Sequence, residues 1–276
     1  GWRPQNSEEV NAWYVGFIRL LQPTLESTQM CERDWAKSVL ASHFRALWSV
    51  AHCFDLLERI IRVYGPGGQW PEIWLSIKKT LHYDSARLLP DPLSRLKALE
   101  GLTAPSNILA EIRSYAFLDP WRHSELHTGG YEEKMEKIQG KVVHLGELSA
   151  VESGVLEDLG AEIWEAHSNA LLWFGEGLAN GSKHQFTVFD RLVKSFERYG
   201  SEKMHPTVFS GFIRGVHDTS PAQAQEMLEQ TLEMAIFRNH AVYLITAIPI
   251  NSWASAKLLE LARGGEHEAG RFQFLS

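Results

Sequence analysis

The sequence predicts an all-α fold, an α-solenoid of helical hairpins of the HEAT or tetratricopeptide type. Apolar residues recur at helical spacing along most of the 276-residue chain, and no alternating run rich in Val, Ile and Thr indicates a strand. The segment Trp173–Ala179 (WFGEGLA) is echoed by Gly211–Val216 (GFIRGV), with Gly177 and Gly215 38 residues apart, and a fainter copy runs from Tyr243 to Leu261. A period of about 32–38 residues built from two helical stretches is typical of such repeats.

The first helices are delimited by a cap, a proline and a glycine-rich turn. A helix is predicted to begin at Ser7, which suits an N-cap, and to stop before Pro23. Residues 31–64 form an apolar-periodic stretch that is long for one globular helix, so we expect a break near Ala41-Ser42 and a helical hairpin. The run Gly65-Pro66-Gly67-Gly68 closes this stretch. It predicts a turn and not a phosphate loop, since no strand precedes it and no Gly-Lys-Ser/Thr follows.

The rest of the chain is predicted to be helical around one irregular segment. Helices are expected over residues 72–81, 91–101, 108–118 and 132–144, and repeat-like helices over 149–263. Asp119–Tyr131 contains Pro120 and two consecutive glycines, so we expect a long loop there. These features divide the chain into an N-terminal helical region (1–130), a helical-repeat region (131–263) and a flexible tail (264–276). One continuous array is the alternative.

Composition and charge narrow the function classes. The hydrophobic share of 44% is ordinary for a globular chain, and the formal net charge of −7 disfavours nucleic acid as a partner. No run approaches the roughly 18 apolar residues of a membrane span, so no membrane partner is expected. Cys31 and Cys53 are too few for a disulfide framework, and a low cysteine count suits the cytoplasm. The start Gly1-Trp2-Arg3-Pro4 lacks an initiator Met, which suggests a piece of a longer protein.

The search for catalytic or metal-binding patterns gives one candidate. His123-Ser-Glu-Leu-His127 places two imidazoles four residues apart, a spacing that brings metal ligands together on a helix. The order is not His-Glu-x-x-His, however, and the surroundings indicate a loop, so a solvated loop or a structural hydrogen bond competes with the metal site. No Gly-x-Ser-x-Gly elbow is present, and Cys53 directly follows His52. We therefore expect no catalytic residue, no metal and no cofactor, with a metal-dependent hydrolase using His123 and His127 as the alternative.

Glycines within helical stretches point to close packing. Gly175, Gly177, Gly211 and Gly215 each cost a helix about 1 kcal/mol relative to Ala. Gly211 and Gly215 are four residues apart and so share a face. A structural role in close contact between neighbouring helices is the expected reason for them, and a ligand passing near the backbone is the alternative.

Tryptophans are the other unusual feature, since the chain has ten of them. Several lie among apolar neighbours in helical patterns and are expected to pack inside: Trp13, Trp35, Trp48, Trp164 and Trp173. In the irregular segment, Trp121 and Arg122 are the side chains we expect to contact a partner, together with His123 and His127. Trp and Arg are favoured interface anchors, whereas the alternative is that Trp121 fills the helical core.

Five packing motifs lie between residues 70 and 262, namely Trp70-Pro-Glu-Ile-Trp74, Ile77-Lys-Lys-Thr-Leu81-His-Tyr-Asp84, Arg95-Leu-Lys-Ala-Leu99, Ile112-Arg113-Ser-Tyr115 and Trp173-Phe-Gly-Glu-Gly-Leu-Ala179. Over this range the chain resembles the helical region of large bacterial proteins, the anti-phage STAND-type NTPases and their relatives. In that group the helical array is the sensor or oligomerisation arm. The chain has no Walker motif and no nuclease or NAD-hydrolase signature.

We therefore expect a non-catalytic scaffold or sensor segment that mediates protein–protein recognition or oligomerisation. The resemblance implies a role in phage defence. The expected partner is another protein or another domain of the same chain.

Overall fold

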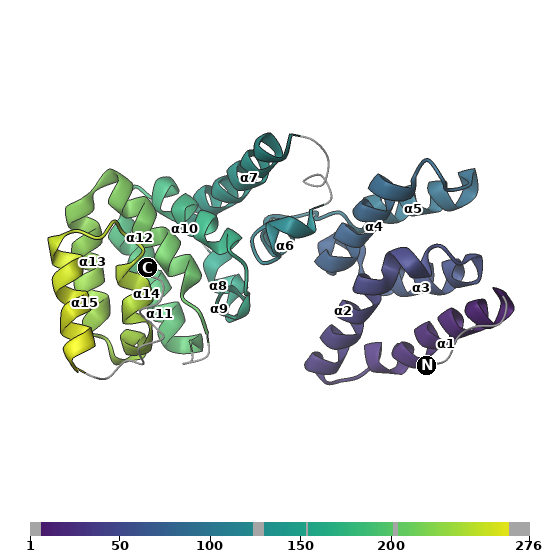
Figure 1. The fold of residues 1–276 in the computed structure, drawn as a ribbon, viewed down its shortest axis with the longest axis horizontal. Coiled ribbons are helices and arrows are strands. Elements are labelled where there is room, and N and C mark those ends of the chain that lie inside the picture. The colour runs from purple at the N-terminus through teal and green to yellow at the C-terminus, as the bar shows by residue number, and fades with distance from the viewer. Residues whose placement is uncertain (1–6, 124–129, 153, 201–203, 265–276) are drawn as a thin grey trace. The chain divides into compact units, whose positions relative to one another are not determined.

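The computed structural model describes residues 7–123, 130–152, 154–200 and 204–264, and all regular secondary structure in these ranges is helical (Figure 1). The all-α class predicted from the sequence is therefore confirmed. The chain forms two compact units. Unit 1 comprises the described residues of Gly1–Ser114 and Trp121–Lys134, and unit 2 those of Tyr115–Pro120 and Met135–Ser276. Apart from Gly264, the predicted tail lies outside the described residues.

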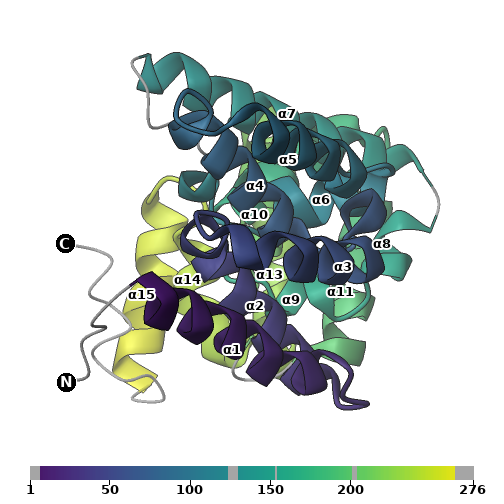
Figure 2. The same cartoon turned by 90° about the vertical axis from the view of Figure 1, so that its right-hand side faces the viewer.

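Unit 1 is built from helices that pack on near neighbours in the chain. Its main helices are α1 (Ser7–Leu25), α2 (Met30–Leu47), α3 (Phe54–Tyr64), α4 (Pro71–Asp84), α5 (Pro90–Thr103) and, up to Ser114, α6 (Ile108–Tyr115). Helix α2 packs on α1 and α4, and α5 packs on α3 and α4 (Figure 2). The core between them is apolar and aromatic, with Ile18, Phe44, Trp48, Ile61 and Leu96 fully buried or nearly so.

Several helix boundaries differ from the sequence prediction: the helix predicted over residues 132–144 runs to Val151, and the one predicted over 108–118 ends at Tyr115. Two further differences lie near the start of the chain. Helix α1 continues through Pro23 to Leu25, because Pro23 lies in the last turn, where a missing N–H interrupts little of the helix. The break in residues 31–64 lies at Trp48–Val50, followed by the short helix η1 (Ala51–Cys53), and not at Ala41-Ser42. The Ser42 hydroxyl donates to the carbonyl of Ser38, so the helix accommodates this serine without breaking.

The predicted glycine-rich turn is present as η2 (Pro66–Gly68). Gly67 and Gly68 have φ angles of 63° and 84°, in the left-handed region that favours glycine. A Cβ atom on Gly68 would lie 2.8 Å from Cα of Pro105 and 2.8 Å from Cβ of Ala110. The turn therefore needs glycine both for its backbone angles and for the chain that packs on it.

Unit 2 continues the all-helical architecture. Its elements are α7 (Tyr131–Val151, in this unit from Met135), α8 (Val155–Leu159), α9 (Glu162–Glu165), α10 (Ala170–Gly181), α11 (Gln185–Tyr199), α12 (Thr207–Thr219), α13 (Pro221–Glu233), η5 (Ala235–His240), α14 (Ala241–Ile245) and α15 (Ser252–Gly264). Phe196 stacks on Phe237 with ring centroids 4.7 Å apart, and the indole of Trp164 packs edge-on against Phe196. This aromatic cluster fills the space between helices that are distant in the sequence.

Glycines let α10 meet α7 and α12 at backbone distance. On one side, a Cβ on Gly177 would lie 2.8 Å from the carbonyl carbon of Val143 and 2.9 Å from Cα of Gly146, both in α7. On the other side, a Cβ on Gly211 would lie 2.7 Å from Cα of Leu172 in α10. Real Cβ atoms do not approach the backbone this closely, so these contacts need glycine.

The remaining two glycines singled out in the sequence lie along the same α10–α12 contact. A Cβ on Gly175 would lie 2.9 Å from the carbonyl carbon of Gly211. Gly215 is less tightly enclosed, since its nearest neighbour would be Cβ of Ala179 at 2.8 Å. Arg214 of α12 pairs with Glu176 of α10 beside these glycines. We call this backbone-to-backbone contact of α10 and α12 the glycine seam.

The short segment before α7 holds the sequence-predicted contact residues. Trp121 lies in η3 (Pro120–Arg122), is 57% exposed and stacks on Tyr131, with ring centroids 5.2 Å apart. Among the helical tryptophans, Trp48 and Trp164 are buried, whereas Trp13 and Trp35 are exposed. The expectation that these tryptophans pack inside is therefore wrong for Trp13 and Trp35.

Candidate functional site

The sequence-predicted binding residues do not form one site. Arg122 is exposed, whereas the neighbouring His123 is 1% exposed and belongs to the interior. His127, the second histidine of the candidate metal pair, lies outside the described residues. Within the described ranges, no group of three or more His, Cys, Asp or Glu side chains could hold a metal ion. None of the helices in these ranges combines the length and apolar composition needed to cross a membrane.

Arg122 instead joins residues of α2 and α4 around a groove in unit 1, which we call the α2–α4 groove. The groove has a volume of about 930 Å³. Helix α2 contributes a stripe of residues spaced three or four apart, and α4 contributes another, so each helix turns one face to the groove. The lining residues that carry the following argument are Ser38, Ser42, Arg45, Trp48, Glu72, Ser76, Lys79, Asp84, Arg87 and Arg122.

Small and hydroxyl side chains shape the walls and hold the two helices together. The Ser76 hydroxyl donates across the helix pair to the carbonyl of Ala41 at 2.7 Å. Thr80 donates within α4 to the carbonyl of Ser76 at 2.8 Å, and Ser49 donates to the carbonyl of Ala46 at 2.6 Å. Because these hydroxyl groups donate to backbone carbonyls, they fix the geometry of the groove.

A second bond between the helices lies at the C-terminal end of the groove. Arg45 Nε and Nη2 donate to the two carboxylate oxygens of Asp84 at 2.6 and 2.8 Å. These bonds hold the pKa of Asp84 below its usual value, although partial burial acts in the opposite direction. The guanidinium of Arg45 also lies 4.9 Å from the ring centroid of Tyr83. A bidentate pair with an aromatic neighbour is a rigid brace between α2 and α4.

Three further cations line the groove without such a partner. Lys79, Arg87 and Arg122 are exposed, and none of their side chains forms a hydrogen bond or salt bridge in the described ranges, although the charge of Arg87 also helps to lower the pKa of Asp84. Of the two lining carboxylates, Asp84 is bonded to Arg45. The other, Glu72, lies in the first turn of α4, away from the braced end. The groove therefore carries an excess of positive charge in a chain whose net charge is −7.

Trp48 adds a buried donor to this lining. Its side chain is fully buried between Phe44 and Phe54, with ring centroids 5.5 and 4.8 Å away. The indole N–H has no acceptor among the described residues. Buried N–H groups without an acceptor cost roughly 1–3 kcal/mol. An acceptor on a molecule that enters the groove would lower that cost if it reached the indole.

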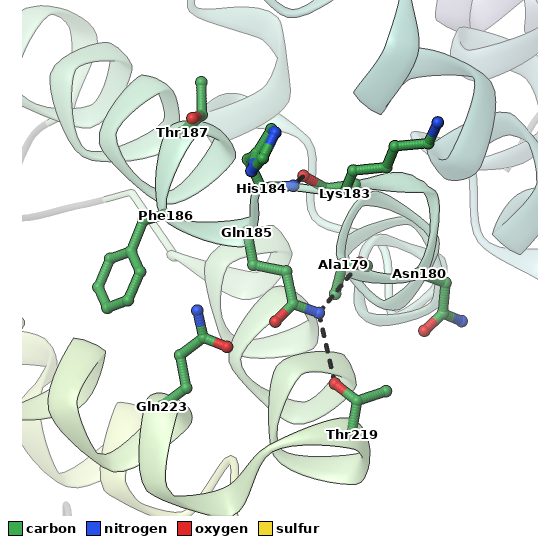
Figure 3. Close-up of a pocket in the computed structure, with 10 residues that line it drawn as sticks. Ala179, Asn180, Lys183, His184, Gln185, Phe186, Thr187, Thr219 and Gln223 are labelled. Carbon is green, nitrogen blue, oxygen red and sulfur yellow. Dashed lines mark hydrogen bonds between the residues drawn. The ribbon is translucent and has the colours of Figure 1, made fainter.

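A smaller hollow of about 640 Å³ lies in unit 2, where α10 and α12 end and α11 and α13 begin. Figure 3 shows Gln185 reaching across it from the start of α11. Its amide donates to the carbonyl of Ala179 at 3.3 Å and to the Thr219 hydroxyl at 3.4 Å. The Gln185 side chain therefore joins the ends of α10 and α12, and we assign this hollow a structural role.

The groove residues other than Arg122 were missed by sequence reasoning. Ser38 and Ser42 lie four residues apart on α2, and Ser76 and Lys79 lie on one face of α4 in the same way. Such residues on one helix resemble an ordinary solvent-facing stripe. Only the packing of α2 on α4, with α3 between them in the chain, turns the two stripes into one site.

No protein-family model matches the sequence, and comparisons with curated proteins and with solved structures give no significant match. The case for a function therefore depends on the chain's own residues.

Proposed function

We propose that this chain is a non-catalytic recognition module that binds a segment of a partner protein in the α2–α4 groove. The observation that carries the proposal is the set of exposed cations, Lys79, Arg87 and Arg122, around one groove with no ion-pair partner in the described ranges. Exposed arginine and lysine beside a preformed hollow suit an interface whose charges are satisfied by the partner.

The rigidity of the groove supports a binding role. The Ser76–Ala41 and Arg45–Asp84 bonds fix α2 and α4 before any partner arrives. A preformed surface lowers the ordering cost of binding, and thus more of the contact energy appears as affinity.

The larger setting is also part of the proposal. Helices that pack on near neighbours in the chain are the arrangement expected of an α-solenoid, and solenoids present extended binding surfaces. The resemblance to the helical arms of STAND-type NTPases motivates a sensor role within a larger bacterial protein of phage defence.

A random peptide library displayed on phage tests the binding function directly. Peptides are selected on the native chain and then measured against Ser42→Trp, which fills the groove from an exposed position of α2. The matched control is Ser94→Trp, at an exposed position of α5 that does not line the groove. We expect selected peptides to bind the native chain and Ser94→Trp equally and to lose affinity for Ser42→Trp by at least roughly tenfold.

Melting temperatures establish that both variants are folded, and Ala46→Trp repeats the test at another exposed groove position. If no peptide is selected, or if the selected peptides bind both tryptophan-filled grooves as well as the native one, the recognition function is wrong.

A further inference from the structure

Building on this recognition function, we propose that the segment held in the α2–α4 groove is acidic. The occupant is a stretch of a partner protein with at least two Asp or Glu side chains, whose carboxylates pair with Lys79, Arg87 and Arg122. The first reason is the charge of the lining. Four cationic side chains face two carboxylates, and one of those carboxylates is already bonded to Arg45. A groove with this balance attracts anionic groups and repels basic segments.

The spacing of the cations indicates several carboxylates and not one compact anion. Lys79 lies in α4 and Arg87 lies just beyond its end, where the backbone N–H of Arg87 still donates to the carbonyl of Asp84 at 2.8 Å. Arg122 comes from a third place, the short helix η3. The cations therefore reach the groove from α4, from the turn after it and from η3. A segment that carries several acidic side chains can meet these cations separately.

The position of the remaining carboxylate gives the occupant an orientation. Glu72 lies in the first turn of α4, and Lys79, Arg87 and the Arg45–Asp84 brace lie toward the other end. Glu72 also acts on Lys37, whose pKa is nevertheless lowered because burial outweighs the nearby Asp34 and Glu72 carboxylates. The acidic residues of the occupant thus belong at the C-terminal end of α4.

The same charges argue against a nucleic acid as the occupant. A polynucleotide carries a phosphate at every step and needs cations along its whole path. Glu72 interrupts such a path in the groove, and the chain as a whole carries a net charge of −7. A protein segment can place its acidic residues at one end only, which matches the distribution in the groove.

The test uses fluorescein-labelled synthetic copies of the library-selected peptides and the double variant Lys79→Glu with Arg87→Glu. The matched control is Arg62→Glu with Lys97→Glu. These residues are two exposed cations on α3 and α5 that line none of the hollows described above, and their replacement changes the net charge equally. Affinities are measured by fluorescence anisotropy, with melting temperatures as the check on folding.

We expect the selected peptides to be rich in Asp and Glu. Changing their acidic residues to Asn and Gln should weaken binding to the native chain by roughly tenfold or more, and the groove double variant should cause a similar loss. The control double variant should stay within about twofold, because distant exposed charges are screened by salt. Peptides with Lys in place of the acidic residues should regain affinity for the groove double variant alone.

Three results would overturn the acidic occupant. The first is the selection of neutral peptides that lose affinity for Ser42→Trp but bind the Lys79 and Arg87 double variant as well as the native chain. In that case the recognition function stands and the acidic preference is wrong. If a single-stranded oligonucleotide displaces the peptides at lower concentration than the peptides themselves require, the groove is a nucleic-acid site. A library that yields no binder removes both proposals together.

Discussion

The α2–α4 pair in unit 1 and the α10–α12 pair in unit 2 solve the same packing problem in different ways. In unit 1, side chains join the helices across a gap, through the Ser76–Ala41 hydrogen bond and the Arg45–Asp84 brace, and a groove remains beside them. In unit 2, glycines remove the side chains at the points of closest contact, and the backbones touch there. The choice between serine and glycine on the contacting face thus decides whether a helix pair presents a hollow or a closed seam.

This difference has a functional consequence. A closed seam leaves no room for another molecule, so the α10–α12 contact can only stabilise the fold. The groove keeps polar and charged groups at the surface, where a partner can reach them. We therefore expect substitutions in the seam to reduce stability and substitutions of groove cations to reduce binding.

The largest expected effect is at the centre of the seam. Gly211→Ala should lower the free energy of unfolding by about 3 kcal/mol, because its Cβ would overlap the backbone of Leu172. Gly140→Ala is the matched control, since Gly140 also lies within a helix of unit 2 but has no atom within 4 Å of its Cβ position. That control should gain about 0.5–1 kcal/mol from better helix propensity. Urea denaturation measures both.

Gly215 provides an intermediate case between Gly211 and Gly140. The nearest atom to its Cβ would be a side-chain carbon of Ala179 and not a backbone atom. Gly215→Ala should therefore cost less than Gly211→Ala. Equal costs at both positions, or a neutral Gly211→Ala, would show that α10 and α12 separate easily and that the seam is not closed.

The next effect concerns the hydrogen bond that joins α2 and α4. Ser76→Ala removes the donor to the Ala41 carbonyl and should lower the free energy of unfolding by about 1 kcal/mol. Ser94→Ala, at an exposed position of α5, should change it by less than about 0.5 kcal/mol. A loss at Ser76 no larger than at Ser94 would mean that the two helices are held by apolar packing alone.

The glycines of α10 and α12 and the serines of the groove differ in how well the sequence identifies them. Glycines within helices are conspicuous because they carry a cost in propensity, so Gly175, Gly177, Gly211 and Gly215 can be singled out from the sequence alone. The serine stripes carry no such signal, since serine on a helix surface is ordinary. Their meaning arises only when α2 and α4 become neighbours, and the sequence does not specify which helices do so.

The exposed tryptophans illustrate a related limit. Trp13 lies on a helix whose buried positions are Ile18, Leu21 and Leu25, and it falls on a different face, where it stacks on Phe17 at 5.6 Å. The apolar periodicity of this stretch predicts a core position for Trp13, although the helix has apolar side chains on both faces. Periodicity identifies the helix reliably, but it does not decide between two apolar faces.

A smaller effect is expected from the brace, and it should depend on pH. The pKa of Asp84 is lowered in the folded chain, so the Arg45–Asp84 pair contributes stability above the unfolded carboxyl pKa of about 3.9 and loses it as the pH falls through the folded value. Because the pair is partly exposed, Asp84→Asn should cost about 0.5–1 kcal/mol at pH 7.

The difference between native and Asp84→Asn chains should shrink as the pH drops below about 4, which urea denaturation at a series of pH values would reveal. Glu157 provides the comparison in unit 2. It forms a similar bidentate pair with Arg191 at 2.8 and 3.0 Å, its pKa is also lowered by these bonds, and its side chain is more exposed than that of Asp84. Glu157→Gln should therefore show the same pH trend with a smaller amplitude. If the stability difference between the native chain and either variant grows toward low pH, that ion pair does not stabilise the fold in the way described.

The smallest effect on stability is expected at the residues that the sequence first suggested for binding. Arg122→Ala and Trp121→Ala should each change the free energy of unfolding by less than about 0.5 kcal/mol, because both side chains are largely exposed. The two variants should differ in peptide affinity, since Arg122 lines the groove whereas Trp121 stacks on Tyr131 outside the groove lining. Arg122→Ala should weaken the selected acidic peptides several-fold, on the order of 1 kcal/mol, and Trp121→Ala should leave their affinity unchanged. If Trp121→Ala lowers the affinity and Arg122→Ala leaves it unchanged, the peptides bind at the aromatic pair of Trp121 and Tyr131 and not in the groove.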